Sequence, residues 1–295
     1  MTAVIAGMDM GGTKTAVFVE SLAGERLAEL ELASDDWDAS PPAAAAVWIA
    51  ERLRLAVPDL AEVVALGVGA QGCDTAEHCR ELAHELGELG LRSTVVNDGA
   101  LLVEAAGFHG GIGVISGTGA IAVGQDSAGD YLITGGWGWV LGDEAGAPGL
   151  VREATKAALS AYDHGLPDDG LLSALQVAFA VNGPAALARA VNDEPTMENW
   201  GSRAPALFAA ADAGSVLALS IIEGGARHLV DLIGQLLNRG SVGFDVVAGG
   251  SVIVNQPRLY GDFVRLLAAE HPLHRPHLLE QPPVVGALAL ARRLV

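Results

Sequence analysis

The chain has 295 residues, of which 51% are hydrophobic and 18% are charged, and its formal net charge is -19 with a sequence pI near 4.6. This length and hydrophobic content suffice for a large core, so we expect two lobes. The negative charge argues against binding nucleic acid or an anionic membrane, because phosphate groups would be repelled. No stretch reaches the roughly 18 apolar residues of a membrane span, and no basic segment precedes the first apolar run as in a signal peptide.

The two cysteines, Cys73 and Cys79, are too few for a disulfide framework. They fit a reduced compartment, so we expect a cytoplasmic protein. An anionic ligand such as ATP would have to be held by backbone amides, helix N-termini and Mg²⁺, because the protein itself is strongly acidic.

The chain begins with three predicted strands, at Val4–Met10, residues 15–21 and Arg26–Ala33. A glycine turn with two hydroxyl residues joins the first two strands; it contains Gly11, Gly12, Thr13, Lys14 and Thr15. Glycine lets backbone N–H groups approach an anion closely, and Asp9 at the strand end could hold a metal ion through water. The segment predicts a phosphate-binding hairpin, with an ordinary tight turn as the alternative.

A P-loop does not explain this segment. Gly7 and Gly12 have the required spacing, but Lys14 comes one residue late. Residues 16–21 are rich in Val and Phe, which indicates a strand where a P-loop needs a helix.

A helix is expected over residues 43–56, after Pro41 and Pro42, and a strand over residues 63–68. Residues 67–72 match the G-x-G-x-x-G pattern of dinucleotide-binding folds. The match is weak, since no acidic residue follows at the expected distance of about 20 residues. A flexible turn at a sheet edge, bordering a ligand, is the alternative.

A helix over residues 75–86 precedes a strand that ends at Asp98, and a short helix follows over residues 100–106. Asp98 could be a general base, although a helix N-cap explains the same position. Residues 110–124 then repeat the strand–glycine turn–strand pattern at the start of the chain, because an apolar strand enters the turn Ser116-Gly-Thr-Gly119 and a second strand follows. Two such hairpins, one in each lobe, could hold the phosphates of a nucleotide from both sides.

A loop with two tryptophans and two carboxylates, Gly135-Gly-Trp-Gly-Trp-Val-Leu-Gly-Asp-Glu144, separates a strand at residues 131–134 from a helix at residues 147–162. Carboxylates accept sugar hydroxyls and aromatic side chains cover the apolar face of a sugar, so a polyhydroxylated ligand fits. The alternative is a packed aromatic turn in which Asp143 caps the helix.

The remaining chain is mostly helical, with helices predicted at residues 169–180, 184–192, 203–213, 215–238, 257–269 and 284–293. In the helix at residues 215–238 the predicted buried stripe is Leu217, Ile221, Leu229, Ile233 and Leu237. A strand from Asp245 runs into Gly249 and Gly250, where the backbone could contact an adenine or ribose, and a short strand is expected at residues 277–280. The Ala-rich helices could form a homodimer face, but core packing explains them equally well.

Taken together, these motifs resemble the N-acetylglucosamine kinase and BadF/BadG ATPase group of the actin-like superfamily. The resemblance covers nearly the whole chain and is carried by Asp9-Met-Gly-Gly-Thr-Lys-Thr15, Asn97-Asp98, Ser116-Gly-Thr-Gly119, Gly135-Gly-Trp-Gly138, Gly142-Asp-Glu144 and Gly249-Gly-Ser251. It implies a two-lobed actin-like (ribonuclease H-like) α/β ATPase fold, in which each lobe is a mixed sheet flanked by helices. We expect residues 1–108 to form the N-terminal lobe and residues 109–295 the C-terminal lobe, with the last helix packing on the N-terminal lobe.

The resemblance also implies roles for particular residues. Gly11, Gly12, Thr13, Lys14 and Thr15 would form the first phosphate loop, Gly117, Thr118 and Gly119 the second, and Gly249 and Gly250 the adenosine loop. Asp9 would lie near Mg²⁺, and Asp98 would accept the proton of the sugar hydroxyl. Gly136, Trp137, Gly138 and Asp143 would contact the sugar, together with Asp36 in the loop after the third strand.

The chain departs from the family pattern near the sugar. Ala120 and Ile121 follow the second hairpin where polar residues are frequent, Ala145 stands where glycine is frequent, and Asp36 stands where such kinases commonly place an asparagine. The extra carboxylate suggests a free amino sugar such as glucosamine as an alternative to N-acetylglucosamine.

The expected reaction is therefore transfer of the ATP γ-phosphoryl group to a hexosamine, at its 6-hydroxyl. An ATPase activator of a reductase or dehydratase is one alternative, although Cys73 and Cys79 lack the usual iron–sulfur arrangement. A non-catalytic sugar sensor or filament protein is another.

Overall fold

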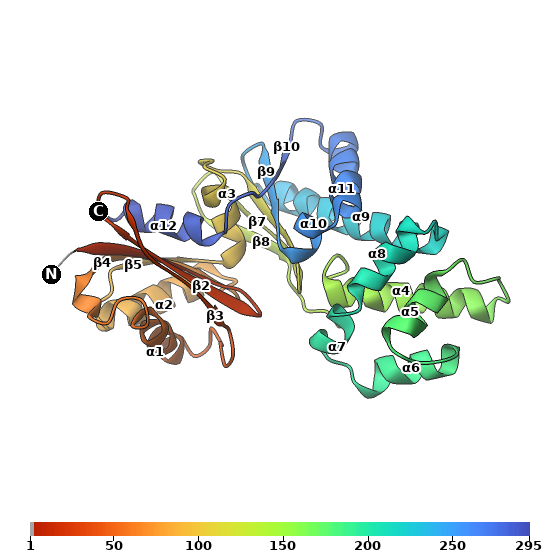
Figure 1. Cartoon of the computed structure of the whole chain (residues 1–295). Coiled ribbons are helices and arrows are strands. Elements are labelled where there is room, and N and C mark those ends of the chain that lie inside the picture. The colour runs from red at the N-terminus through yellow and green to blue at the C-terminus, as the bar shows by residue number, and fades with distance from the viewer. Residues whose placement is uncertain (1–2) are drawn as a thin grey trace.

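Two five-stranded mixed sheets of related topology form the centre of the molecule (Figure 1). The computed structural model describes residues 3–295. The strand order is β3-β2-β1-β4-β5 in the first sheet and β10-β9-β6-β7-β8 in the second. In each sheet three consecutive strands form an antiparallel meander, and two later strands add in parallel beside the first of them. The sequence shows a similarity between the two glycine hairpins, and in the structure this similarity extends to the topology of both whole sheets.

The first sheet contains β1 (Val4–Met10), β2 (Lys14–Ser21), β3 (Arg26–Ala33), β4 (Val63–Ala70) and β5 (Ser93–Val96). Its helices α1 (Pro42–Leu53) and α2 (Ala76–Glu88) pack on one face, where Ile49 and Leu82 belong to the same buried core as Met8. Because side chains alternate along a strand, Ile5, Gly7 and Asp9 point to the other face.

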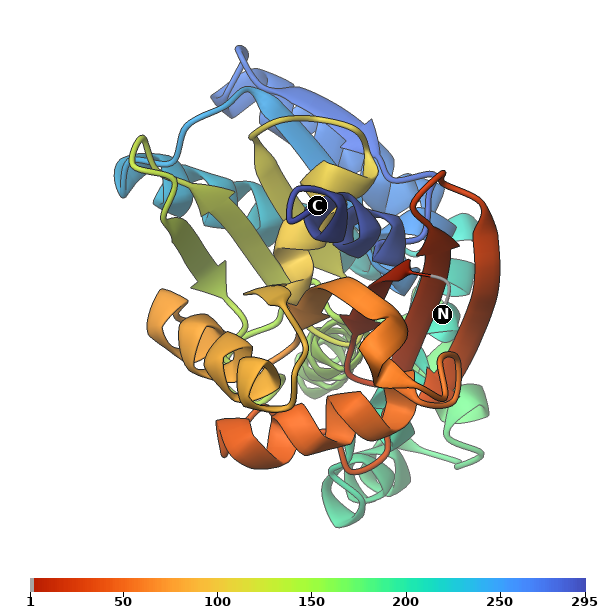
Figure 2. The same ribbon diagram turned by 90° about the vertical axis from the view of Figure 1, so that its left-hand side faces the viewer.

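That other face of the first sheet is covered by the last helix, α12 (Val284–Arg292), which returns from the second half of the chain (Figure 2). Its backbone lies directly on the strands: a Cβ atom at Gly67 of β4 would come within 1.8 Å of the Ala287 carbonyl oxygen. Arg292 pairs with the buried Glu20 of β2, and Arg293 donates to Glu104 across 3.0 Å. The expectation that the last helix packs on the first lobe agrees with these contacts, whereas the boundary between residues 108 and 109 stays a prediction.

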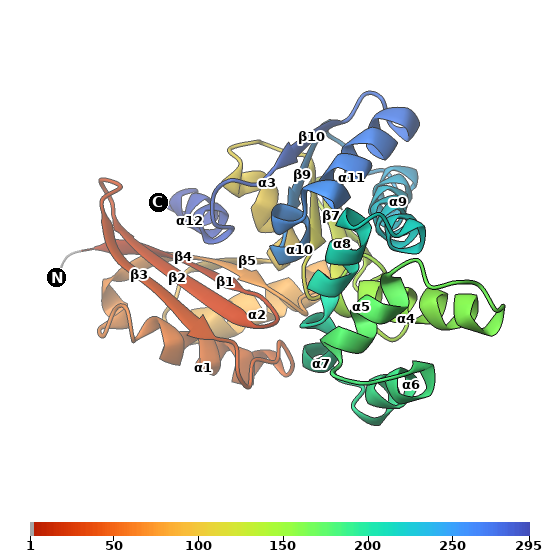
Figure 3. The same ribbon diagram turned by 45° about the vertical axis from the view of Figure 1, so that its right-hand side comes forward.

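The second sheet contains β6 (Ile112–Ser116), β7 (Ala120–Gln125), β8 (Tyr131–Gly135), β9 (Asp245–Gly249) and β10 (Arg275–Leu278). Helices α4 (Ala147–Asp163), α9 (Val216–Asn238) and α11 (Pro257–Glu270) share its main core, and α3 (Leu101–Ala105) packs on the opposite face. Figure 3 shows α5 (Leu171–Ala178), α6 (Pro184–Asp193), α7 (Met197–Gly201) and α8 (Ala204–Asp212) gathered beside α4, on the same side of the molecule as the second sheet.

The structure corrects several predicted elements. The strand expected at residues 277–280 lies two residues earlier, as β10, and the short helices α7 and α10 (Ser251–Asn255) were not predicted. In α9 the predicted stripe is only partly right: Leu229 and Ile233 are buried, but Ala218, Ile222 and Leu236 are buried in place of their neighbours Leu217, Ile221 and Leu237.

No single helix within residues 3–295 is long and apolar enough to cross a membrane, and one bent pair, Met197–Asp212 with Val216–Asn238, qualifies by combined length and composition alone. Much of α9 belongs to the core described above.

Candidate active site

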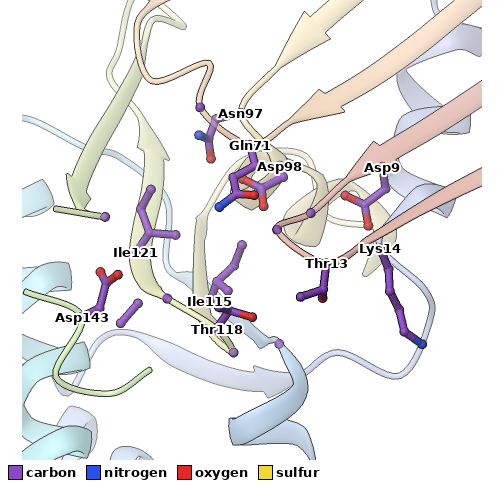
Figure 4. Close-up of a pocket in the computed structure, with 18 of the residues that line it drawn as sticks. Asp9, Thr13, Lys14, Gln71, Asn97, Asp98, Ile115, Thr118, Ile121 and Asp143 are labelled. Atoms are coloured by element: carbon purple, nitrogen blue, oxygen red, sulfur yellow. The ribbon is translucent and has the colours of Figure 1, made fainter. Parts of the chain in front are cut away.

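A cleft of about 600 Å³ lies between the two sheets and is lined by residues from both (Figure 4). The predicted site residues that line it are Asp9, Gly11, Gly12, Thr13, Lys14, Asp98, Gly117, Thr118, Gly119, Gly136, Gly138, Asp143 and Gly250. Four others do not line it: Thr15, Asp36, Trp137 and Gly249. Residues that are up to about 240 positions apart in sequence therefore meet in one cavity.

The first hairpin (residues 11–14) presents backbone amides to this cleft. Gly11 N–H donates to the Lys14 carbonyl across 3.0 Å and closes the turn. Within residues 3–295 no hydrogen bond uses the N–H groups of Gly12 and Thr13. The Lys14 ammonium pairs with Glu31 of β3 across 2.6 Å, so it is directed along the sheet and not toward the cleft centre. The free amides, more than the lysine, suit this turn to an anion.

The second hairpin (residues 117–119) is built in the same way. Gly117 N–H donates to the Gly119 carbonyl across 3.0 Å, and the N–H groups of Thr118 and Gly119 make no hydrogen bond among the described residues. Gly250 presses against this hairpin from β9: its φ is 98°, and a Cβ there would come within 2.5 Å of the Ser116 carbonyl oxygen. Only glycine fits such a position.

Two of the predicted residues serve packing in this structure. Thr15 is fully buried and its hydroxyl bonds to that of Ser34 across 2.9 Å. A Cβ at Gly249 would come within 2.7 Å of the Leu102 side chain, so this glycine allows α3 to approach β9. Their predicted role in nucleotide binding stays a prediction.

Asp9 and Asp98 both line the cleft, Asp9 near the first hairpin and Asp98 nearer Asn97 and Gln71 (Figure 4). Burial raises the pKa of Asp9 to about 8, and the negative charge of Asp98 adds to the shift. Burial likewise raises the pKa of Asp98 to about 7; the Gly99 amide opposes this shift and the charge of Asp74 adds to it. A carboxyl group that titrates near neutral pH is suited to general-base catalysis.

Asn97, and not Asp98, caps the turn after β5. Its side-chain oxygen accepts the Gly99 N–H across 3.0 Å at the start of a 3₁₀ turn over Asp98–Ala100. The N-cap explanation for Asp98 is therefore wrong, and its carboxylate is left to face the cleft. Sequence could not separate the two, because Asn and Asp have nearly equal N-cap preferences.

The tryptophan loop (residues 135–142) borders the opposite side of the cleft. Arg152 of α4 donates to the Gly142 carbonyl across 3.1 Å and also to the Trp139 carbonyl, which ties the loop to the helix. Trp137 is 76% exposed at the tip, and Gly136 and Gly138 both have positive φ. The loop therefore presents a large free aromatic side chain beside the cleft.

Asp143 follows this loop and has a left-handed backbone, with φ of 56°. It does not cap α4 through its side chain, as one alternative expected, because the N-cap is Gly146, whose N–H donates to the Asp143 carbonyl across 2.8 Å. Its carboxylate lies beneath the second hairpin, where a Cβ at Gly119 would come within 3.1 Å of Oδ2. Burial raises the pKa of Asp143 above its ordinary value, and the Ala120 amide opposes the shift.

Several lining residues were not predicted as site residues: Trp37, Asp38, Ala39, Gln71, Gly72, Asp74, Asn97, Leu102, Ile115, Met197, Ser251 and Pro283. Gln71 and Gly72 end the weak G-x-G-x-x-G match and form the turn after β4, and this turn lines the cleft. Trp37 Nε1 donates to the Gln71 carbonyl across 3.1 Å and brings the loop after β3 to the cleft. Asp36 lies one residue before it on an exposed turn, with φ of 59°.

The residues present suit a magnesium nucleotide. No group of three or more His, Cys, Asp or Glu side chains within residues 3–295 could enclose a metal ion by itself. Mg²⁺ in nucleotide sites is bound through one or two carboxylates, substrate phosphates and water, and Asp9 with the two hairpins offers this combination. Burial is the main cause of the raised pKa of both Asp9 and Asp98, and the negative charge of a neighbouring aspartate adds to each shift.

Known proteins resemble the chain along most of its length. An N-acetylmuramic acid/N-acetylglucosamine kinase of Clostridium acetobutylicum is 26% identical over 301 residues, which is 98% of each chain. An N-acetyl-D-glucosamine kinase of Dictyostelium discoideum is 24% identical over 256 residues, 80% of each chain.

Two solved structures share the fold. A candidate N-acetylglucosamine kinase from Chromobacterium violaceum has a TM-score of 0.73 at 23% identity and covers 98% of this chain and 99% of that one. A ROK family glucokinase from Streptomyces griseus, in complex with glucose and AMPPNP, has a TM-score of 0.55 at 19% identity over 99% of this chain and 100% of that one. The predicted two-lobed actin-like ATPase fold is confirmed. The model of the BadF/BadG/BcrA/BcrD ATPase family matches residues 6–291, and the chain belongs to this family.

Proposed function

We propose that this protein is an ATP-dependent amino-sugar kinase that transfers the γ-phosphoryl group of ATP to the 6-hydroxyl of a hexosamine, N-acetylglucosamine or glucosamine. The observation that carries the proposal is the position of Asp98, a carboxylate with a pKa of about 7, in a cleft between two hairpins with free amides. The names of the Clostridium and Dictyostelium relatives support the amino sugar as acceptor.

The proposed roles follow from the geometry. Phosphoryl transfer proceeds through a loose transition state, so the protein mainly positions the reactants and stabilises negative charge. The amides of residues 12–13 and 118–119 would hold phosphate oxygens, and Gly250 would let the backbone approach the adenosine. Mg²⁺, held by Asp9 directly or through water, would offset phosphate charge when the nucleotide is bound.

Asp98 would accept the proton of the attacking sugar hydroxyl. Gly136, Gly138 and Asp143 line the same cleft and would bind the sugar hydroxyls, with Trp137 closing on the sugar face. Closure of the lobes would exclude water, which otherwise competes with the sugar for the γ-phosphoryl group.

The alternative of an ATPase activator receives no support from the cysteines. Cys73 is fully buried, and the Cys79 thiol donates to the Cys73 carbonyl across 3.6 Å, so neither thiol is presented for a cluster shared between subunits. Homodimer formation and a cytoplasmic location stay predictions.

The test is a coupled ADP-release assay over glucosamine, N-acetylglucosamine, N-acetylmuramic acid, N-acetylmannosamine and glucose. We expect the two hexosamines named above to stimulate ADP release most strongly. In the variant Asp98→Asn, sugar-dependent release should fall by about 10²-fold or more, because the base is lost, while the Kd for ATP stays within about twofold.

Asp193→Asn, at an exposed position at the end of α6, is the matched control and should keep full activity. Sugar phosphorylation by Asp98→Asn at the wild-type rate would refute the assignment of the base. If none of the sugars in the panel stimulates ADP release by the wild-type protein, the kinase proposal itself is refuted.

A further inference from the structure

Asp74 lines the cleft beside the proposed base but has no role in the scheme above. It lies between β4 and α2, just before Thr75, which caps α2 by accepting the His78 N–H. The Asp74 side chain therefore does not cap the helix. Its Oδ1 atom instead accepts a hydrogen bond from Asn97 Nδ2 across 2.9 Å.

Asn97 links Asp74 to the turn that carries Asp98. The Asn97 side chain is 2% exposed, and it makes hydrogen bonds through both ends of its amide. The Gly99 N–H is a donor and requires Oδ1, so Nδ2 must point the other way, toward Asp74. A carboxylate can only accept, so Asp74 disfavours the flipped amide, in which Oδ1 would face the carboxylate and Nδ2 would face the Gly99 N–H.

The rest of the turn is confined by close packing. A Cβ at Gly113 of β6 would come within 2.2 Å of the Gly99 carbonyl oxygen, and a Cβ at Gly69 of β4 would come within 2.2 Å of the Leu101 side chain. The turn is thus pressed between the two sheets, and the hydrogen bond that Asn97 donates to Asp74 fixes the side of the turn that faces the cleft. This turn carries Asp98, which lines the cleft.

We propose that Asp74 is a positioning residue for phosphoryl transfer: through the Asn97 amide it holds the Asn97–Gly99 turn in the orientation that aims the Asp98 carboxylate at the acceptor hydroxyl. The inference rests on the proposed function, because it takes Asp98 to be the base. It predicts a loss in kcat and little change in nucleotide binding, since neither Asp74 nor Asn97 lies on the phosphate hairpins.

A near-isosteric set of variants tests this inference. Asn97→Asp places two carboxylates face to face and should lower kcat for the sugar by about 10- to 100-fold, because the turn is displaced, while KM for ATP stays within about twofold. The double variant Asp74→Asn with Asn97→Asp restores both bonds, since an amide at 74 can donate to the new carboxylate and this carboxylate accepts the Gly99 N–H. We expect kcat to return to within about threefold of wild type. Asp74→Asn alone keeps an acceptor for the Asn97 amide, so its kcat should fall only slightly. Asp74→Ala has no acceptor, and its kcat should fall as far as that of Asn97→Asp.

Hydrogen exchange of the Gly99 amide gives a second readout that does not need activity. Protection should fall in Asn97→Asp and Asp74→Ala and return in the exchanged pair. Two results would overturn this inference without touching the proposed function, provided that the wild type is active. One is that Asp74→Ala keeps the wild-type kcat, and the other is that the double variant has no higher kcat than Asn97→Asp. A wild type inactive on every sugar refutes the proposed function, and the exchange data then decide separately whether Asp74 orders the turn.

Discussion

The two central carboxyl groups make the ligand-free protein sensitive to pH. Asp9 and Asp98 have pKa values of about 8 and about 7 in the fold, against 3.8 for an unperturbed aspartic acid. The folded state therefore binds more protons than the unfolded state between about pH 4 and pH 8, and its free energy of unfolding falls as the pH rises through this range. The stabilisation is complete below pH 3.8 and is lost as the pH passes the folded pKa values.

We predict that Asp9→Asn flattens this dependence. At pH 8 the variant should be more stable than wild type by on the order of 1–3 kcal/mol in denaturant unfolding, since a buried charge is removed, and at pH 5 the two should be closer. Asp193→Asn serves as the surface control, with the wild-type slope. If the free energy of unfolding depends on pH in the same way for Asp9→Asn and wild type, the Asp9 carboxyl does not have a raised pKa in the folded protein.

The sequence predicted some of these residues and not others for physical reasons. Asp9, Asp98 and the glycine turns have local signatures, because a strand ending in a carboxylate or glycine can be recognised without knowing its neighbours. Gln71 lies in a glycine turn that the sequence reveals, but its contact with the first hairpin has no local signature. A Cβ at Gly12 would come within 3.0 Å of the Gln71 side chain, and the two residues are 59 positions apart. The loop after β3 has no periodicity, so its sequence could not decide between Asp36 and Trp37 as the residue at the cleft.

Among the elements, α12 lies with its backbone directly against the first sheet. We predict that Gly67→Ala lowers the free energy of unfolding by about 2–4 kcal/mol, because a Cβ there would overlap the Ala287 carbonyl and force the helix away from β4. Urea or thermal unfolding measures the effect.

Gly87→Ala in α2 is the matched control. A Cβ at Gly87 meets nothing within 4 Å, so the same substitution should be neutral or stabilising by up to about 1 kcal/mol. Equal stability of the two variants would mean that α12 is not held against β4 as described.

The element boundaries show which signals in the sequence are strong. The first three strands were predicted nearly to the residue, because alternation and glycine turns define them. The five-residue helices α7 and α10 are too short for a periodic pattern. In α9 the predicted buried stripe contains only large apolar residues, but Gly225 and Ala226 are also buried, so small residues face the core as well.

For the whole molecule, the cleft suggests an open state that closes on its ligands. Trp137, Val140 and Leu141 of the tryptophan loop are 76%, 66% and 83% exposed beside it. We predict that sugar and a non-hydrolysable ATP analogue together reduce the radius of gyration and shift tryptophan fluorescence to shorter wavelength, because the lobes close over the loop.

Trp137→Phe should remove most of the fluorescence shift while the change in the radius of gyration remains, which identifies the reporter. Unchanged X-ray scattering at saturating ligand concentrations would contradict closure. Length and hydrophobic content predict two lobes, but the arrangement of the two sheets could be predicted only through the family resemblance, because composition and periodicity do not determine how two sheets face each other.

The position of α12 also bears on how the protein is made. The outer face of β1, near residue 5, is covered by a helix that begins at Val284, so the first sheet cannot complete its core until that helix has left the ribosome. The last strand of this sheet ends at Val96 and α12 ends at Arg292, so at about 5–20 residues per second the delay is on the order of 10–40 s. During that time Ile5, Phe18 and Ala65 form an uncovered apolar surface. Nascent chains stalled before and after α12 should therefore differ in chaperone binding at the first lobe.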